Sequence, residues 1–140
     1  MLVGIYLFFG ALQDFRKRKI RTEYLKIGGI AGSVYTVTEI LKGNNNFLNW
    51  IIAMIPGFII LIIAKFTKEK IGYGDGWVFI ILANFLTITE IWYVLQTAIF
   101  LTTLFSLFLI LSKKAFKGYQ IPFLPFLLAA YLILKGLRYV

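Results

Sequence analysis

Long uncharged stretches alternate with short polar segments along this chain. Residues 47–64 and 91–112 contain no charged side chain, and roughly 17–25 apolar residues in a helix cross about 30 Å of hydrocarbon. The first and fourth predicted helices are short for a full crossing, which leaves open an arrangement of four complete and two partial crossings. The hydrophobic pattern predicts helices at 1–15, 24–41, 47–65, 75–89, 91–112 and 120–137.

The composition agrees with a chain that folds in lipid. Hydrophobic residues make up 60% of the sequence and charged residues 15%, whereas an average soluble domain is about 25% charged. We therefore predict an all-α, polytopic integral membrane protein, with residues 1–140 forming a single membrane-embedded domain. The first apolar stretch lacks the basic segment that opens a secretory signal, so we interpret it as a retained helix.

The basic residues are unevenly distributed between the two predicted faces of the bundle. If the helices alternate in direction, twelve of the fifteen lysines and arginines fall in three loops on one face. The positive-inside rule makes this face cytoplasmic. We therefore predict an outside N-terminus and localisation to the cytoplasmic membrane, where these cations contact anionic headgroups and not nucleic acid. The three predicted cytoplasmic loops contain Arg16 to Lys26, Lys65 to Lys70, and Lys113 to Lys117.

The chain contains no cysteine and no histidine. This excludes disulfides, thiolate zinc sites, haem ligation by histidine, and catalysis by a cysteine or histidine side chain. Any chemistry has to come from other groups, and we expect no metal and no cofactor.

Two aspartates are the only ones in the sequence, Asp14 and Asp75. Both lie at the predicted cytoplasmic ends of helices, although 61 positions separate them. Carboxyl groups near membrane depth are energetically unfavourable and indicate function by default. By contrast, Glu23 lies among cations, which is typical of a solvated ion pair, and Glu39 and Glu90 lie towards the other face.

Three glycines surround the second aspartate, at Gly72, Gly74 and Gly76. A backbone without side chains can bend and allow another segment to approach closely. An alternative interpretation is a glycine-rich loop that enters a helix with Asp75 as the N-cap. Further glycines, Gly28 and Gly32 in the second predicted helix, have the spacing of close helix packing.

Two carboxyl groups within a few ångströms of one another cannot both ionise, so one keeps its proton. The ionised group can then take a proton from water while the protonated group polarises a peptide carbonyl. This is the chemistry of an aspartyl protease, and it needs neither metal nor cofactor.

These residues resemble the peptidase domain of type IV prepilin peptidases, the GxGD membrane aspartyl proteases. Residues 14–20, an aspartate followed by a basic run and Ile20, match the first family motif in spacing, although Arg21 and Thr22 replace its Pro-Asn. The GxGD motif is intact at residues 72–75, whereas Gly76 and Trp77 replace the small apolar residue and lysine that follow it in many members. A weaker likeness lies at residues 121–126, where the alternative is two prolines that open a helix.

The resemblance implies six helices, catalytic aspartates at Asp14 and Asp75, and an active-site loop containing Gly72, Gly74 and Gly76. The implied substrate is a prepilin-like protein, cut between a short basic leader and the hydrophobic helix that follows. Longer members also methylate the new N-terminus and carry Cys-x-x-Cys motifs. Because this chain has no cysteine, it resembles the short, peptidase-only members.

Other functions remain open from the sequence alone. Paired carboxyl groups also serve as proton relays in proton-coupled transporters, although those usually show internal repeats. A non-catalytic scaffold of a pilus or secretion machine would use Asp75 only as a helix cap. Other GxGD proteases cleave signal-peptide remnants or transmembrane segments, but their first aspartate lies in a Tyr-Asp pair, whereas Asp14 follows Gln13.

Overall fold

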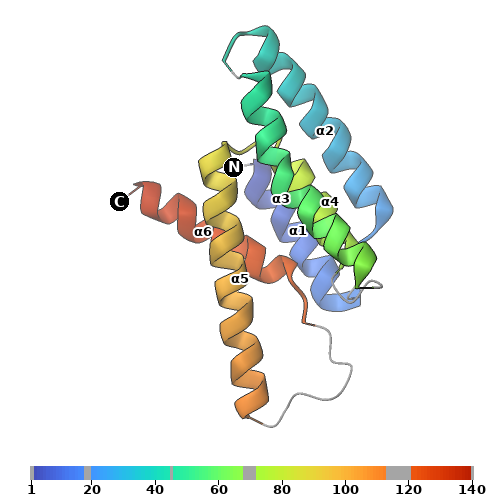
Figure 1. Ribbon diagram of the computed structural model, residues 1–140, viewed down its shortest axis with the longest axis vertical. Helices are drawn as coiled ribbons and strands as arrows, with labels where there is room; N and C mark the ends of the chain where they lie inside the picture. The colour runs from blue at the N-terminus through green and yellow to red at the C-terminus, as the bar shows by residue number, and fades with distance from the viewer. Residues whose placement is uncertain (1, 18–19, 45, 68–71, 113–120, 140) are drawn as a thin grey trace.

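The computed structural model describes residues 2–17, 20–44, 46–67, 72–112 and 121–139. This described part is all-helical, which confirms the predicted fold class (Figure 1). Much of the three predicted basic loops, at residues 18–19, 68–71 and 113–120, lies outside it. The helices are α1 (Leu2–Lys17), α2 (Thr22–Leu41), α3 (Phe47–Phe66), α4 (Tyr73–Leu82), α5 (Ile88–Leu111) and α6 (Leu124–Tyr139).

The fourth helix differs most from its prediction. A helix over 75–89 was expected, but α4 begins at Tyr73 and ends at Leu82. The side-chain amide of Asn84 donates hydrogen bonds to the carbonyls of Ile80 and Ile81 at 3.1 and 3.2 Å. The Ile81 carbonyl also accepts from the backbone amide of Asn84 at 3.1 Å, so Asn84 supplies partners for carbonyls in the last turn of α4, as helix ends require.

A capping box starts the next helix. The side chain of Thr87 accepts a hydrogen bond from the amide of Glu90, and the Glu90 carboxylate accepts one from the amide of Thr87 at 2.9 Å. Because the two residues satisfy each other's exposed amides, α5 begins immediately after this turn. The segment between α4 and α5 is therefore a defined corner rather than a continuation of the helix.

The sixth helix begins later than predicted, at Leu124 and not at residue 120. Pro125 lies in its first turn, where proline is tolerated because the missing amide would have no helical partner. Pro56, by contrast, lies inside α3 without ending it, and its side chain is buried.

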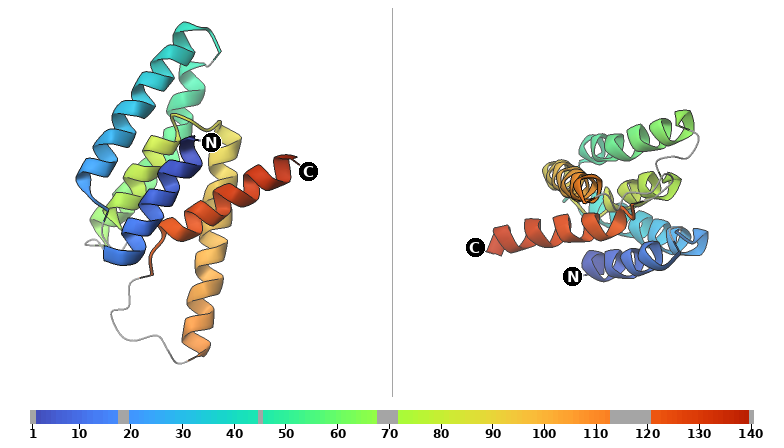
Figure 2. Two further views of the ribbon diagram at one scale, coloured as in Figure 1. Left: turned by 180° about the vertical axis from the view of Figure 1, so that it is seen from behind. Right: turned by 90° about the horizontal axis from the view of Figure 1, so that it is seen from below.

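The helices form a bundle in which two members depart from the common direction. The α2–α3 pair is antiparallel, and α4 lies alongside α3 (Figure 1). The second half of α5 extends beyond the other helices, and α6 crosses α5 obliquely when seen from the front (Figure 1) and from behind (Figure 2, left). The end of α1, the start of α2, the end of α3 and the start of α4 gather at one end of the molecule, which we call the basic end.

The buried core is small and lies where α1, α4, α5 and α6 meet. Its largest fully buried side chains include Leu7, Phe79, Leu82, Ile91 and Leu124. Many large apolar side chains elsewhere are exposed, for example along the outer faces of α2, α3 and α5. Among the described helices, Phe47–Phe66 and Ile88–Leu111 are long and apolar enough to cross a membrane.

Glycines let the helices approach closely, as the spacing in α2 predicted. Gly28 and Gly32 are both buried. Gly28 packs against the ring of Tyr6 on α1, and a Cβ atom at Gly32 would lie 3.0 Å from the Cβ of Asn84. Tyr6 also stacks on Tyr24, with ring centroids 4.3 Å apart. Close contact between these helices thus depends on the absence of side chains at two positions one helical turn apart.

Candidate active site

Asp14 lies near the end of α1 and is buried, with 7% of its surface exposed. One carboxylate oxygen accepts a hydrogen bond from the backbone amide of Leu124, at an N–O distance of 3.0 Å. Leu124 is the first residue of α6, so Asp14 satisfies an amide that the helix itself cannot. A negative charge on Asp14 also interacts favourably with the positive end of the α6 dipole.

Gly10 makes this contact accessible. It lies one turn before Asp14 on α1, and a Cβ atom there would lie 2.6 Å from the Cδ2 of Leu124. The Leu124 side chain, which is fully buried, can therefore pack directly on the α1 backbone. The absence of a side chain at Gly10 thus leaves room beside the α1 backbone for the Tyr24 hydroxyl and for Leu124, whose amide donates to Asp14.

Asp75 lies in the first turn of α4, and its side chain is partly exposed. The N-cap of α4 is Gly72 and not Asp75, so the alternative prediction of Asp75 as the cap is wrong. The amide of Asp75 donates to the carbonyl of Gly72 at 3.1 Å. A Cβ atom at Gly72 would lie 2.7 Å from the Oδ2 of Asp75, so the carboxyl group folds back over this glycine.

The other two glycines of the motif admit neighbouring segments. A Cβ atom at Gly74 would lie 2.7 Å from the Cδ1 of Ile20, the residue that follows the basic run after Asp14. A Cβ atom at Gly76 would lie 2.7 Å from the Cγ of Leu61 on α3. Each glycine therefore contacts a different segment. Gly74 and Gly76 thus admit other segments, as predicted, whereas Gly72 is covered only by Asp75 of its own turn.

The fold brings the two aspartates to the same end of the bundle. Ile20, six residues after Asp14, packs against Gly74, the residue before Asp75. The rings of Phe79 on α4 and Phe123 before α6 also meet, with centroids 6.1 Å apart. The end of α1, the first turns of α4 and the start of α6 thus lie together at this end of the bundle.

The remaining acidic residues of the described chain are engaged elsewhere. Glu23 forms an exposed ion pair with Arg21 at 3.0 Å, as predicted for a solvated pair. At the opposite end of the bundle, Glu90 pairs with Lys135 at 3.4 Å and with Arg138. No group of three or more potential metal ligands occurs among the described residues.

The pattern of the type IV leader peptidase family matches residues 1–111 of the sequence. The chain belongs to this family. Searches of curated proteins and of solved structures found no significant match. Family membership, together with two helices long and apolar enough to cross a bilayer, identifies a membrane protein with a leader peptidase type of function.

The matched part of this leader peptidase chain contains both aspartates and all three motif glycines, but not α6. The amide that contacts Asp14 comes from α6, 110 positions further along the chain. Sequence reasoning did not assign Leu124 to the site. The signal available was the proline-containing segment 121–126, which resembles a weak family feature.

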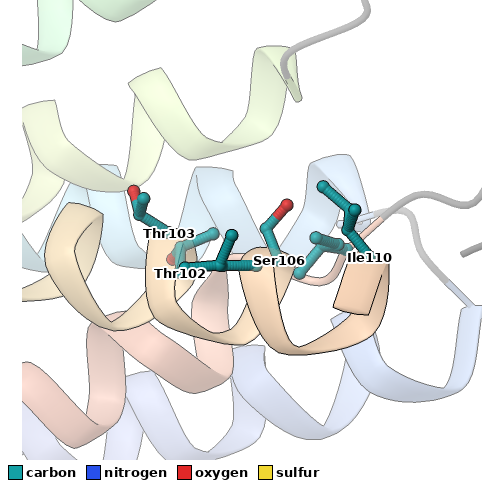
Figure 3. A pocket seen from close by; sticks show the side chains of 6 residues that line it. Thr102, Thr103, Ser106 and Ile110 are labelled. Carbon is teal, nitrogen blue, oxygen red and sulfur yellow. The ribbon is translucent and has the colours of Figure 1, made fainter. Parts of the chain in front are cut away.

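A hollow of about 370 Å³ adjoins the start of α6 in this leader peptidase. Thr102, Thr103, Ser106 and Ile110 of α5 line it (Figure 3), and Ile121 closes one side. The hydroxyls of Thr102 and Thr103 donate to the carbonyls of Ala98 and Ile99 in the preceding turn. Their oxygens retain lone pairs that can accept hydrogen bonds, so the hollow combines apolar walls with polar acceptors near the segment that binds Asp14.

Proposed function

We propose that this chain is a membrane aspartyl endopeptidase that removes the short basic leader from type IV prepilin-like substrates at the cytoplasmic face of the membrane. The proposal is supported by the match to the leader peptidase family and by the contact between Ile20 and Gly74, which brings together the segments that carry Asp14 and Asp75. We further propose that residues 1–140 form one membrane-embedded peptidase domain of about six membrane helices, in which the ten-residue α4 crosses only part of the bilayer.

The proposed mechanism follows from two interacting carboxyl groups of which one holds a proton. The ionised aspartate takes a proton from a water molecule, and this water attacks the carbonyl carbon of the scissile peptide bond. The protonated aspartate donates a hydrogen bond to the carbonyl oxygen, where negative charge develops. The nitrogen of the leaving amine must then receive a proton, which an aspartate can supply. No step requires a metal or a cofactor.

The two carboxyl groups lie in different surroundings, one buried and the other partly exposed. Asp14 is held by the amide of Leu124 and is buried, whereas Asp75 is partly exposed and adjoins the glycines of its loop. A peptide backbone can approach most closely where no side chains project. Gly72 places no side chain over the partly exposed carboxyl group, whereas Gly74 is covered by Ile20, so we propose that an extended substrate approaches Asp75 from the Gly72 side.

One alternative has a specific observation in its favour. The hydrogen bond from Leu124 gives Asp14 a structural role, which a non-catalytic scaffold of a pilus or secretion machine would also need. A proton-coupled transporter would use the same carboxyl pair as a relay. Membership of the leader peptidase family favours the peptidase, and product analysis separates the peptidase from the other two.

Incubation of the purified chain with a prepilin-like substrate and S-adenosylmethionine tests whether the chain cleaves the leader and whether it also methylates the product. We expect the released leader and a mature product with a free, unmethylated N-terminus, because methylation needs a second folded pocket for the methyl donor. Mass spectrometry of the intact product distinguishes the outcomes. An uncut substrate would contradict the peptidase proposal, and a product heavier by one methyl group would contradict the restriction to cleavage.

The proposed orientation makes a separate prediction. With the basic end in the cytoplasm, a cysteine at Thr22 should resist an impermeant thiol reagent in intact cells, whereas a cysteine at Asn44 should react. The sequence has no native cysteine to interfere. Labelling after cell disruption serves as the control for reactivity. Modification of the Thr22→Cys protein from outside intact cells would reverse the assignment of the two faces.

A further inference from the structure

A groove of about 720 Å³ runs between α2 and α4, away from the core, with α3 at its floor. It is distinct from the hollow beside α5. Its walls are mainly apolar and include Leu25, Ile30 and Val34 of α2 and Trp77 and Ile80 of α4. A volume of this size is within the range of small-molecule binding sites, about 300–1,000 Å³.

Gly29 of α2 lines the groove and leaves open space beside its backbone. A Cβ atom at Gly29 would meet no atom within 4 Å, whereas its neighbour Gly28 packs against Tyr6. Consecutive glycines therefore serve opposite faces of α2. Gly28 brings α1 close, and Gly29 widens the groove.

The polar groups at the inner end of the groove need no ligand. The side-chain oxygen of Asn84 accepts hydrogen bonds from Thr36 at 2.8 Å and from Trp50 at 3.1 Å. Its amide nitrogen is bonded to the carbonyls of α4 described above, and the hydroxyl of Ser33 donates to the carbonyl of Gly29 at 2.8 Å. Since these groups are satisfied within the chain, an occupant of the inner end should be apolar.

The outer end, near the start of α2, has the opposite character. Lys26 and Thr22 line it, and within the described part of the chain Lys26 makes no ion pair. A long helical side chain points back towards the helix N-terminus, which places the ammonium group at the mouth. The nearby carboxylate of Glu23 is already paired with Arg21. The groove thus ends in a cation that can accept an anionic partner.

The length of the groove favours a lipid over a transmembrane helix. From Thr22 to Val34, α2 rises about 18 Å, close to the roughly 15 Å of hydrocarbon in one leaflet of a bilayer about 30 Å thick. An acyl chain reaches through one leaflet, whereas a transmembrane helix needs a contact surface through both. An apolar channel of one-leaflet depth with a cation at its mouth matches a single anionic lipid.

We propose that an anionic phospholipid occupies this groove, with its phosphate at Lys26 and an acyl chain along Gly29 and Ile80. Basic pockets between membrane helices recognise lipid headgroups through such charge pairing. Trp77 lies two residues after Asp75 on the same helix and lines the groove. The lipid therefore packs against α4 and supports the helix that carries Asp75. This inference does not depend on the catalytic proposal, because lipid occupancy can be measured without cleavage.

Quenching of Trp77 fluorescence by brominated lipid tests the proposal in the full-length chain. The test protein carries Trp92→Phe, and a reference protein carries both Trp92→Phe and Trp77→Phe. The fluorescence of Trp77 is the fluorescence of the test protein minus that of the reference protein. At equal mole fraction, brominated phosphatidylglycerol should bind about fivefold more favourably than brominated phosphatidylcholine, as expected for one basic side chain at a membrane surface. Lys26→Gln should abolish this preference, whereas Lys42→Gln, at the other end of α2, should preserve it.

A second pair of variants tests the location of the acyl chain. A Cβ atom at Gly29 meets no other atom within 4 Å, so Gly29→Leu extends its side chain into the groove and should reduce quenching by both lipids. Gly136→Leu is the matched control, since a Cβ atom there also meets nothing within 4 Å but lies outside the groove. Equal quenching by both lipids in the protein with native Lys26 would overturn the proposal. Relief of quenching by a prepilin-like substrate would also overturn it, by showing that the substrate helix fills the groove.

Discussion

Replacement of either aspartate should abolish leader cleavage. Asp14→Asn and Asp75→Asn each remove a group that must gain or lose a proton during the reaction, and we expect the cleavage rate to fall by about three orders of magnitude. The measurement is the rate of leader release from a prepilin-like substrate by the purified proteins. Near-normal cleavage by either variant would exclude the proposed carboxyl pair.

A comparison of two substitutions at Asp14 separates catalysis from structure. The side-chain oxygen of asparagine can still accept the hydrogen bond from the Leu124 amide, so Asp14→Asn should unfold at nearly the native temperature. Asp14→Ala loses this cap as well, and its free energy of unfolding should fall by about 1 kcal/mol. Both variants should be inactive. If activity followed stability, with Asp14→Asn active and only Asp14→Ala impaired, the scaffold role of Asp14 would be the correct one.

The second large effect is expected at Gly57, where α3 and α4 are in closest contact. A Cβ atom there would lie 2.6 Å from the Cγ1 of Ile80, 2.9 Å from its backbone nitrogen and 3.0 Å from the carbonyl oxygen of Gly76. Two of these atoms belong to the α4 backbone and cannot rotate away. Gly57→Ala should therefore lower the free energy of unfolding by about 1–3 kcal/mol, as overpacking does.

The same substitution should reduce activity, because α4 carries Asp75 one residue before Gly76. A displacement of the order of 1 Å can lower a rate by about a hundredfold, so we expect a loss of roughly ten- to a hundredfold in cleavage. Gly136→Ala provides the control, since its Cβ atom meets nothing. In the Gly57→Ala background, Ile80→Ala removes only the nearest side-chain atom and should restore stability in part. Full restoration would show that the backbone contacts are unimportant.

The sequence predicted the helical fold class and most helix positions correctly, because these depend on local properties. An uncharged run such as 47–64 forms a helix wherever it lies in lipid, and the predicted and observed bounds of α3 differ by one residue. The two aspartates were also identifiable, since a carboxyl group at the end of an apolar segment is unusual in itself. Their catalytic role stays a prediction.

Only the tertiary structure decided where those aspartates lie and what surrounds them. The bond between Asp14 and Leu124 joins segments 110 positions apart, and it depends on the space left by Gly10. The end of α4 at Leu82 depends on the side chain of Asn84, whose other partners come from α2 and α3. Hydrophobic periodicity acts over one or two helical turns, whereas these contacts arise from the close packing of helices distant in the chain. The sequence therefore determined which segments are helical and which carry charge, and packing determined which of their side chains meet.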